Sequence, residues 1–257
     1  MPETHIDLKS TIPSIKIKTE GVEKLLRNIN RSKQHPKQDT KTMCKTTSTI
    51  TSHHIPEFHR HWSPPKRLAK CEYIQHLQKR RKTLGRKLHI SLTSVPCKLI
   101  EHIICRNMMN HLEKHNILTS LNHGFRSGYS CETQLAVTIH DMLQSFDRKK
   151  QLDITILDFS KAFDTVPHDI LLHKLNNYGI RGPLHTWLTV FLTKRKMRVA
   201  LEGKFSNEAT VESGVPQGTV QEPILFLCHI NDLPNAVSSK VRLFSDDCLL
   251  YREIKQR

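Results

Sequence analysis

The sequence lacks the features that would place it in a membrane or direct it to secretion. No apolar run approaches the roughly eighteen residues that a transmembrane helix needs, and the nearest, PILFLCHI at 223–230, is far too short. The N-terminal stretch MPETHIDLKST is polar and has no apolar segment of the kind found in secretion signals. We therefore expect an intracellular protein, nuclear or cytoplasmic, that is not secreted and has no membrane partner.

Paired cysteines and aromatic residues are also scarce. The seven cysteines form no Cys-x-x-Cys pair and no zinc-binding spacing, which favours reduced thiols and no disulfide partner. Aromatic residues account for 6% of the chain and hydrophobic residues for 37%, and both values are low for a compact fold. A chain of 257 residues can form one large domain or two small ones, but part of this one is predicted to lack a hydrophobic core.

Acidic residues are nearly absent from one segment, and this imbalance produces most of the net charge. Residues 31–90 contain 15 Lys or Arg and only 3 Asp or Glu, which is +12 of the formal net charge of +16. The segment 31–88 is rich in Lys, Thr, His and Pro and has no sustained apolar period, so we predict that most of it is disordered. A basic segment suggests nucleic-acid binding, whereas the rest of the chain is nearly neutral.

Outside that segment, the chain has the patterns of helices and strands in irregular alternation. Apolar residues at three- and four-residue steps predict a helix within 14–30 and another that includes Leu99 to Leu112. A further helix is expected after a cap at Ser130 or Thr133, and one more before Gly179. Alternating apolar residues predict a strand that ends at Asp158, a later hairpin, and two short strands around an Asp-Asp pair. Because helices and strands do not alternate strictly, the expected class is α+β, with an antiparallel sheet backed by helices.

Three aspartates stand where the predicted strands end. Asp158 closes one strand, and Asp246 and Asp247 lie at the tip between two others. If these strands are neighbours, the carboxylates converge, and a few hard oxygen ligands of this kind describe a Mg²⁺ site with positions open for substrate phosphates. Two such ions polarise the attacking and the leaving oxygen of a phosphoryl transfer. The alternative is an ordinary solvated hairpin tip, because Asp is a favoured turn residue.

The stretches around these acids resemble a known family. LDFSKAFDTVPHDILLHKLNNYGIRG, SGVPQGTVQEPILFLCHINDLP and VRLFSDDCLLY, in this order, resemble the reverse transcriptases of non-LTR (LINE-like) retrotransposons. SLTSVPCKLIEHII and HGFRSGYSCETQL are similar to the fingers segments that precede them in that family. The resemblance covers roughly 90–251 and touches 14–30, which is similar to an upstream helix. It implies the fingers and palm of a right-hand polymerase acting on an RNA template, a DNA primer and deoxynucleoside triphosphates.

The same resemblance assigns roles to single residues. Asp158, Asp246 and Asp247 would be the catalytic ligands of two Mg²⁺ ions in the palm. Phe163 would lie against the sugar of the incoming nucleotide, where a ribose would clash; its alternative role is that of a core phenylalanine. All four assignments are what the resemblance implies.

Three further residues are implied to bind nucleotide or template. Gln217 and Gly218, in VPQG, would line the pocket over both, and the alternative is an ordinary turn. Arg126, in GFRSG, would contact nucleic acid or phosphate from the fingers, and the alternative is a solvated loop arginine. Asp164 is expected to orient its loop rather than to bind metal.

The chain also departs from the family pattern. Glu222 stands where a glycine is usual, which adds a Cβ and a charge near the nucleotide pocket. Ser245 replaces a small alanine, and KLHISL at 87–92 lacks the usual Arg-Pro. Within 31–88 the resemblance vanishes, and we interpret this segment either as translated out of frame or as a genuine basic RNA-binding linker. The predicted domains are therefore an upstream helix remnant at 1–30, the basic segment 31–88, and an incomplete fingers and palm domain at 89–257.

Three functional hypotheses follow from the sequence. The first is a fragment of a non-LTR reverse transcriptase, with the thumb missing after Arg257 and no endonuclease before the fingers, and inactive as this chain alone. The second is a non-catalytic RNA-binding module that uses the basic segment. The third is another Mg²⁺-dependent phosphoryl-transfer protein, which the order of the VPQG and FSDD stretches argues against.

Overall fold

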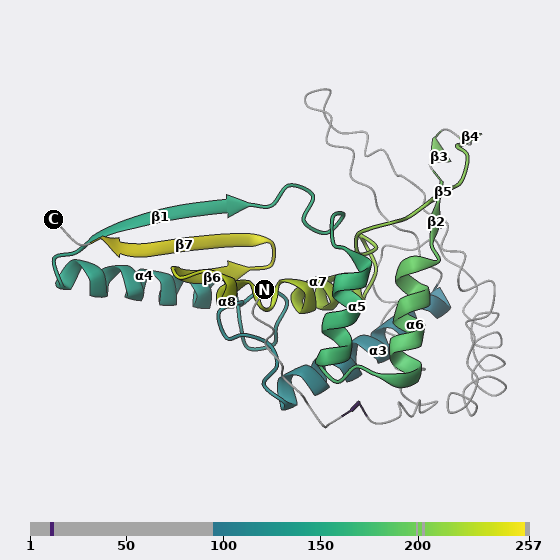
Figure 1. Cartoon of the computed structure of the whole chain (residues 1–257), viewed down its shortest axis with the longest axis horizontal. Coiled ribbons are helices and arrows are strands. Elements are labelled where there is room, and N and C mark those ends of the chain that lie inside the picture. Colours follow the sequence, from purple (N-terminus) through teal and green to yellow (C-terminus); the bar gives the residue numbers. More distant parts are fainter. Residues whose placement is uncertain (1–10, 13–94, 199, 202–203, 255–257) are drawn as a thin grey trace.

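The computed structural model describes residues 11–12, 95–198, 200–201 and 204–254 (Figure 1). The predicted upstream helix at 14–30, the basic segment 31–88 and the KLHISL stretch lie outside these described residues. Within the described residues, no helix combines the length and the apolar character needed to cross a membrane.

The described chain mixes helices and strands without strict alternation. Its elements are, in order, α3 (Val95–Lys114), α4 (Cys131–Asp147), β1 (Gln151–Asp158), α5 (His168–Asn177), α6 (Gly182–Thr193), β2 (Lys196–Met197), β3 (Ala200–Leu201), β4 (Lys204–Phe205), β5 (Ala209–Thr210), α7 (Glu222–Ile230), α8 (Leu233–Ala236), β6 (Lys240–Phe244) and β7 (Asp247–Ile254). The predicted strand to Asp158 and the two strands around the Asp-Asp pair are confirmed. The predicted helix before Gly179 is confirmed as α5, and Gly179 follows it with a left-handed φ of 81°.

The main sheet has three antiparallel strands in the order β1-β7-β6. Strand β7 therefore lies in the middle, and the whole of β1 pairs with it from Gln151–Ile254 to Asp158–Asp247. The later hairpin is formed by two small ladders, β2 with β5 and β3 with β4. The α+β class with an antiparallel sheet and helices beside it is confirmed (Figure 1).

The hydrophobic core lies where α3, α5, α6 and α7 meet one face of β6 and β7. Helix α3 buries the three- and four-step apolar residues that the sequence predicted, and α7 is short but almost entirely buried because it lies between α3 and α5. The strands contribute every second residue, as strand geometry requires. The least exposed members include Ile104, Met108, Leu112, Leu171, Leu175, Leu188, Leu225, Val241, Leu243 and Cys248.

Helix α4 is built differently from the other long helices. Ser130 caps it, in a capping box with Thr133, so the first of the two caps that the sequence offered is confirmed. The side chains that α4 buries are polar, and its large apolar side chains face outward. The buried set is Gln134, Thr138, Asp141 and Ser145, and the exposed set is Leu135, Ile139, Leu143 and Phe146.

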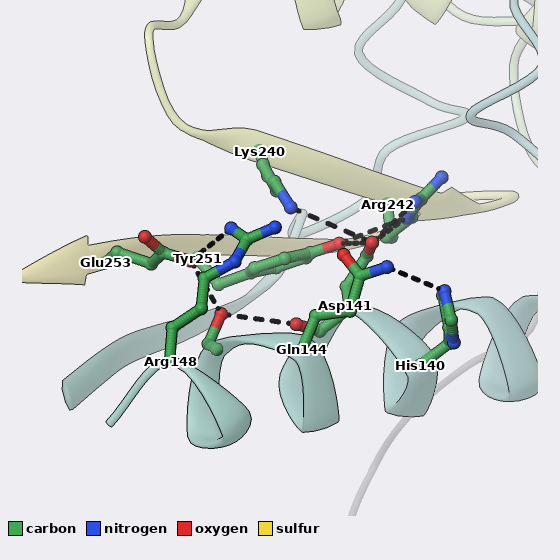
Figure 2. A network of polar contacts seen from close by, with 9 residues as sticks. His140, Asp141, Gln144, Arg148, Lys240, Arg242, Tyr251 and Glu253 are labelled. Atoms are coloured by element: carbon green, nitrogen blue, oxygen red, sulfur yellow. Dashed lines mark hydrogen bonds and ion pairs between the residues drawn. The ribbon is translucent and has the colours of Figure 1, made fainter. Parts of the chain in front are cut away.

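Polar contacts attach α4 to the sheet, and Asp141 is their centre (Figure 2). Its carboxylate accepts hydrogen bonds from Arg242 Nη2 at 2.5 Å, from Arg242 Nε at 3.2 Å and from the Tyr251 hydroxyl. Lys240 Nζ lies 3.7 Å from the same carboxylate. These partners come from β6 and β7, so one acid on the helix joins two strands.

Candidate functional site

The end of the main sheet brings two of the three predicted metal ligands together. Asp158 is the last residue of β1 and pairs with Asp247, the first residue of β7. Directly opposed residues of an antiparallel ladder point to the same face, with Cβ atoms about 4.5–5.5 Å apart. Asp246 lies in the turn that joins β6 to β7. Asp158 and Asp247 are exposed, so water limits the repulsion between these neighbouring acids.

A loop from before α4 supports this acid turn. Ser245 has a left-handed φ of 60° and is 8% exposed. The amide of His123 donates to the Leu243 carbonyl at 3.1 Å, and the Leu243 amide donates back to the Leu121 carbonyl at 2.9 Å. A Cβ on Gly124 would lie 2.3 Å from the Ser245 nitrogen, so only glycine fits at this close approach.

Asn122 completes the support of the turn. Its Oδ1 accepts hydrogen bonds from the amides of Gly124 at 2.9 Å and of Ser245 at 3.4 Å. The sequence prediction missed both Asn122 and Gly124 as residues that shape the acid turn. The only signal was that NHG precedes the FRSG stretch, and nothing local relates it to a turn more than a hundred residues later.

The loop that follows Asp158 is bonded to the loop that carries VPQG. The amide of Gly214 donates to the Val166 carbonyl, and the amide of Val215 donates to the Phe163 carbonyl, both at 2.8 Å. Gly214 has a φ of 85°, and a Cβ there would lie 2.6 Å from the Asp164 carbonyl oxygen. The two loops are thus held as one unit beside the acid turn.

Phe163 lies at the edge of the core in this unit. Its ring is half-buried and contacts the ring of Phe226 on α7, with a centroid separation of 4.3 Å. This contact is the core role that the sequence left open. The role against a nucleotide sugar stays a prediction.

Gln217 and Gly218 lie on the same unit, immediately before α7. Gln217 is half-buried, and Gly218 is exposed with a φ of 84°. Glu222, the residue that departs from the family pattern, is the first residue of α7, and its Oε2 accepts a hydrogen bond from the Gly218 amide at 2.5 Å. The added carboxylate therefore lies at the predicted pocket without needing a left-handed backbone.

Arg126 is used inside the protein. Its side chain is 6% exposed and forms a two-pronged ion pair with Glu113, with both N···O distances 2.9 Å. The guanidinium also donates to the Thr119 carbonyl at 2.6 Å and lies 4.5 Å from the centroid of the Tyr129 ring. It is therefore not the solvated loop arginine of the alternative reading, and these contacts brace the loop that leads to α4.

The three aspartates match a hard divalent cation in donor chemistry. All three offer carboxylate oxygens, which Mg²⁺ prefers, and the two that are exposed can turn toward an ion at little cost. Within the described ranges, however, no three Asp, Glu, His or Cys side chains are gathered closely enough to hold a metal ion. The strand pairing therefore brings the backbone positions of Asp158 and Asp247 together, while the carboxylates are not yet gathered around one point.

An antiparallel sheet with helices beside it and acids at one end is the arrangement of a polymerase palm. The family described as reverse transcriptase (RNA-dependent DNA polymerase) matches residues 77–257, which is more than half of the chain. The chain therefore belongs to the reverse transcriptase family. The match includes the end of the basic segment 31–88.

Curated relatives come from mobile elements. The chain is 32% identical over 145 residues to a probable RNA-directed DNA polymerase from transposon BS of Drosophila melanogaster, covering 56% of this chain and 16% of the relative. It is 31% identical over 169 residues to the one from transposon X-element of the same species, covering 63% and 18%. The predicted resemblance to non-LTR retrotransposon reverse transcriptases is confirmed. The chain spans less than a fifth of the length of these relatives.

Solved structures agree at the level of the fold. A partial Cas6-RT-Cas1–Cas2 complex matches with a TM-score of 0.51 and 15% identity, covering 93% of this chain and 38% of that one. The apo telomerase of Candida tropicalis matches with a TM-score of 0.53 and 10% identity, covering 80% and 44%. These likenesses fit a reverse transcriptase fold of the fingers and palm kind, and the absence of a thumb stays a prediction.

Proposed function

We propose that this reverse transcriptase domain carries a nucleotidyl-transfer site at the end of its main sheet, which extends a DNA primer along an RNA template. The observation that supports the proposal most is the register that pairs Asp158 with Asp247 beside Asp246. A solvated hairpin tip needs no acid on the neighbouring strand, whereas a metal-dependent transfer site does. The substrates would be deoxynucleoside triphosphates.

Asp158, Asp246 and Asp247 would hold the divalent ions. Reverse transcriptases use such ions, and when two are bound they activate the primer hydroxyl and stabilise the leaving pyrophosphate. The chain itself would contribute placement, because the turn is fixed by Ser245 and by its contact with Gly124. Placement is a large part of the rate in reactions of this kind.

The neighbouring loops would contact the incoming nucleotide. Phe163 would limit the space at the sugar, and its packing on Phe226 would keep the ring from moving away. Gln217 and Gly218 would line the base and template side of the same pocket. The hydrogen bonds between the two loops support this arrangement, because they keep both halves of the pocket in one register.

The test is binding of deoxythymidine triphosphate by the 257-residue chain with and without Mg²⁺, measured by calorimetry. Asp158→Asn and Asp247→Asn should abolish the Mg²⁺-dependent part of the affinity. Asp153→Asn is the matched control, because Asp153 is an exposed aspartate of the same strand five residues from the acid end. Equal Mg²⁺-dependent affinity in all three variants would contradict the proposal.

Primer extension separates this function from the second hypothesis of the sequence. DNA synthesis that requires Mg²⁺ and is abolished by Asp246→Asn would support the transfer site. We expect little or no extension by this chain alone, since it spans less than a fifth of its curated relatives. Salt-sensitive RNA binding that survives Asp246→Asn would instead favour a non-catalytic RNA-binding module.

A further inference from the structure

Two carboxylates from different helices hold the turn that carries Gln217 and Gly218. Glu222, at the start of α7, accepts the Gly218 amide at 2.5 Å. Glu101, in α3, accepts the Val220 amide at 2.7 Å through its Oε2. The two acids thus accept hydrogen bonds from two amides of one short turn, Gly218 and Val220, and they do so from different helices.

Glu101 is unusual because it is a carboxylate in the core. It is 1% exposed and lies 119 residues before its partner Val220. Its own backbone carbonyl accepts the Gln221 side-chain amide at 3.0 Å, and Gln221 is fully buried. Burying a carboxylate is costly unless it is hydrogen-bonded, so the amides of the turn are what this acid needs.

We propose that Glu101 and Glu222 are positioning residues that fasten the 217–221 turn at the nucleotide pocket, and that the fastening weakens when the two carboxylates carry their charge. The inference rests on the proposed function, because that function is what makes this turn part of a nucleotide pocket. The fastening itself consists of the hydrogen bonds to the Gly218 and Val220 amides. Among the described residues, neither acid forms a hydrogen bond or ion pair with the three aspartates, so their role is to place Gln217 and Gly218.

The charge dependence follows from burial. Burial raises the pKa of Glu101 to about 7, although the amides of Val220 and Gln221 and the charge of Lys98 lower it in part. Burial and the charge of Asp164 raise the pKa of Glu222 to about 7, against the effect of the Gly218 amide. Cys105 is a further titratable neighbour of Glu101, and its thiol pKa is itself raised by burial and by Glu101.

The direction of the pH effect is fixed by these raised values. A group whose pKa is higher in the closed turn than in water stabilises the closed turn at low pH, and loses that contribution as the pH rises through the raised value. This contribution is complete below the ordinary value of 4.5 and is lost across the window up to about 7, so the turn should be held more firmly at pH 6 than at pH 8. For a pKa that moves from 4.5 to about 7, the opening equilibrium changes about tenfold per carboxylate between these two pH values.

Hydrogen exchange of single amides in the 257-residue chain tests the fastening. After correction for intrinsic rates, protection of the Gly218 and Val220 amides should fall about tenfold per carboxylate from pH 6 to pH 8. Glu222→Gln should remove that dependence at Gly218, and Glu101→Gln should remove it at Val220. The Leu175 amide in α5 serves as the internal reference, because a general loss of stability would change its protection as well.

Glu212→Gln is the matched control, since Glu212 is an exposed glutamate just before the same loop. It should leave the pH dependence of both amides unchanged. Protection at Gly218 and Val220 that does not depend on pH in the unaltered chain would overturn the inference. An effect of Glu212→Gln equal to that of Glu222→Gln would also overturn it. Because Glu222 is half-buried at a helix start, the Glu222→Gln variant is expected to fold even if Glu101→Gln does not.

Nucleotide binding separates this inference from the proposed function. Affinity for Mg²⁺-bound deoxythymidine triphosphate should be lower at pH 8 than at pH 6, and Glu222→Gln should flatten that profile. Unchanged pH profiles of binding in both Glu variants would overturn the positioning role. A pH-dependent turn in a chain that binds no nucleotide would support the fastening and contradict the proposed function.

Discussion

The two longest helices, α3 and α4, are attached to the molecule by opposite means. Helix α3 buries Leu99, Ile104, Met108 and Leu112, whereas α4 buries polar side chains and exposes its apolar ones. In Figure 1, α4 lies along the three-stranded sheet, and α3 lies among α5, α6 and α7. Apolar burial is non-directional, so the α3 side gains stability from contact area, while the α4 side gains a defined orientation from a few partners.

The charge on Asp141 shows how the α4 side works. Burial by itself would raise the pKa of Asp141, but hydrogen bonds from Tyr251 and Arg242, together with the charges of Arg242 and Lys240, outweigh it and lower the pKa. The acid therefore remains ionised at the helix–sheet contact. Removing one partner is expected to be costly, because it would leave the other charge without its counterpart.

The largest effect is expected on the apolar side. Leu225→Ala, in α7, should lower the free energy of unfolding by roughly 2–5 kcal/mol, because Leu225 is fully buried and the change leaves a cavity. Urea denaturation followed by circular dichroism measures it. Leu225→Met is the control and should cost less than about 1.5 kcal/mol. An equal loss in both variants would mean that the packing here is not close.

A smaller but more local effect is expected on the polar side. Asp141→Asn should cost roughly 2–3 kcal/mol, since Arg242 would remain largely buried without an anionic partner. Amide exchange should show that α4 loses protection before α3 and α7 do. The control is Asp147→Asn, at the exposed end of the same helix, which should change little. Uniform loss of protection in all helices would contradict the comparison.

Lowering the pH should distinguish the α4 side of the unaltered chain from the α3 side. The pKa of Asp141 is lowered in the folded chain, so its contribution is complete above its ordinary pKa of 3.8 and is lost as the pH falls through the lowered value. Below that range α4 should lose protection relative to α3. This acid-dependent loss should be smaller than the loss that Asp141→Asn causes at neutral pH, and the acid dependence should be absent in that variant. An acid transition in which α3 opens first would refute this ordering.

The smallest effect is expected on the outer face of α4. Ile139→Gln should change the free energy of unfolding by no more than about 0.5 kcal/mol, because Ile139 is 45% exposed and lies outside the core. Leu135→Gln should behave in the same way. Urea midpoints are the measurement, set against Leu225→Ala. A loss above about 2 kcal/mol would mean that this face is covered in solution.

The sequence predicted those parts of the fold that depend on local pattern. The apolar steps before residue 114, the cap at Ser130, the strand end at Asp158 and the stop at Gly179 each rest on a few neighbouring residues. The face that α4 buries could not be predicted, because its partners Arg242 and Tyr251 lie about a hundred residues away. Helix α7 was missed, since its continuous apolar run has no clear period. Helix α6 was missed although Leu184, Trp187, Leu188 and Leu192 recur at helical spacing.

The candidate site divides in the same way. The three aspartates could be selected by residue type and by their places at strand ends. Whether they lie close together depended on which strands are neighbours, and only the pairing of β1 with β7 answers that. Glu222 was noticed only because it departs from a family pattern. Glu101, Asn122 and Gly124 gave no local signal, because each acts on a turn more than a hundred residues away.

The close approach of Gly124 to Ser245 leaves the acid turn no slack. One added methyl group at position 124 must push against backbone, since its nearest neighbour would be the Ser245 nitrogen at 2.3 Å. Gly124→Ala is therefore a way to shift Asp246 while every carboxylate and its charge are retained. Such a variant can show whether the domain requires only that three acids are present, or also that they lie at defined positions.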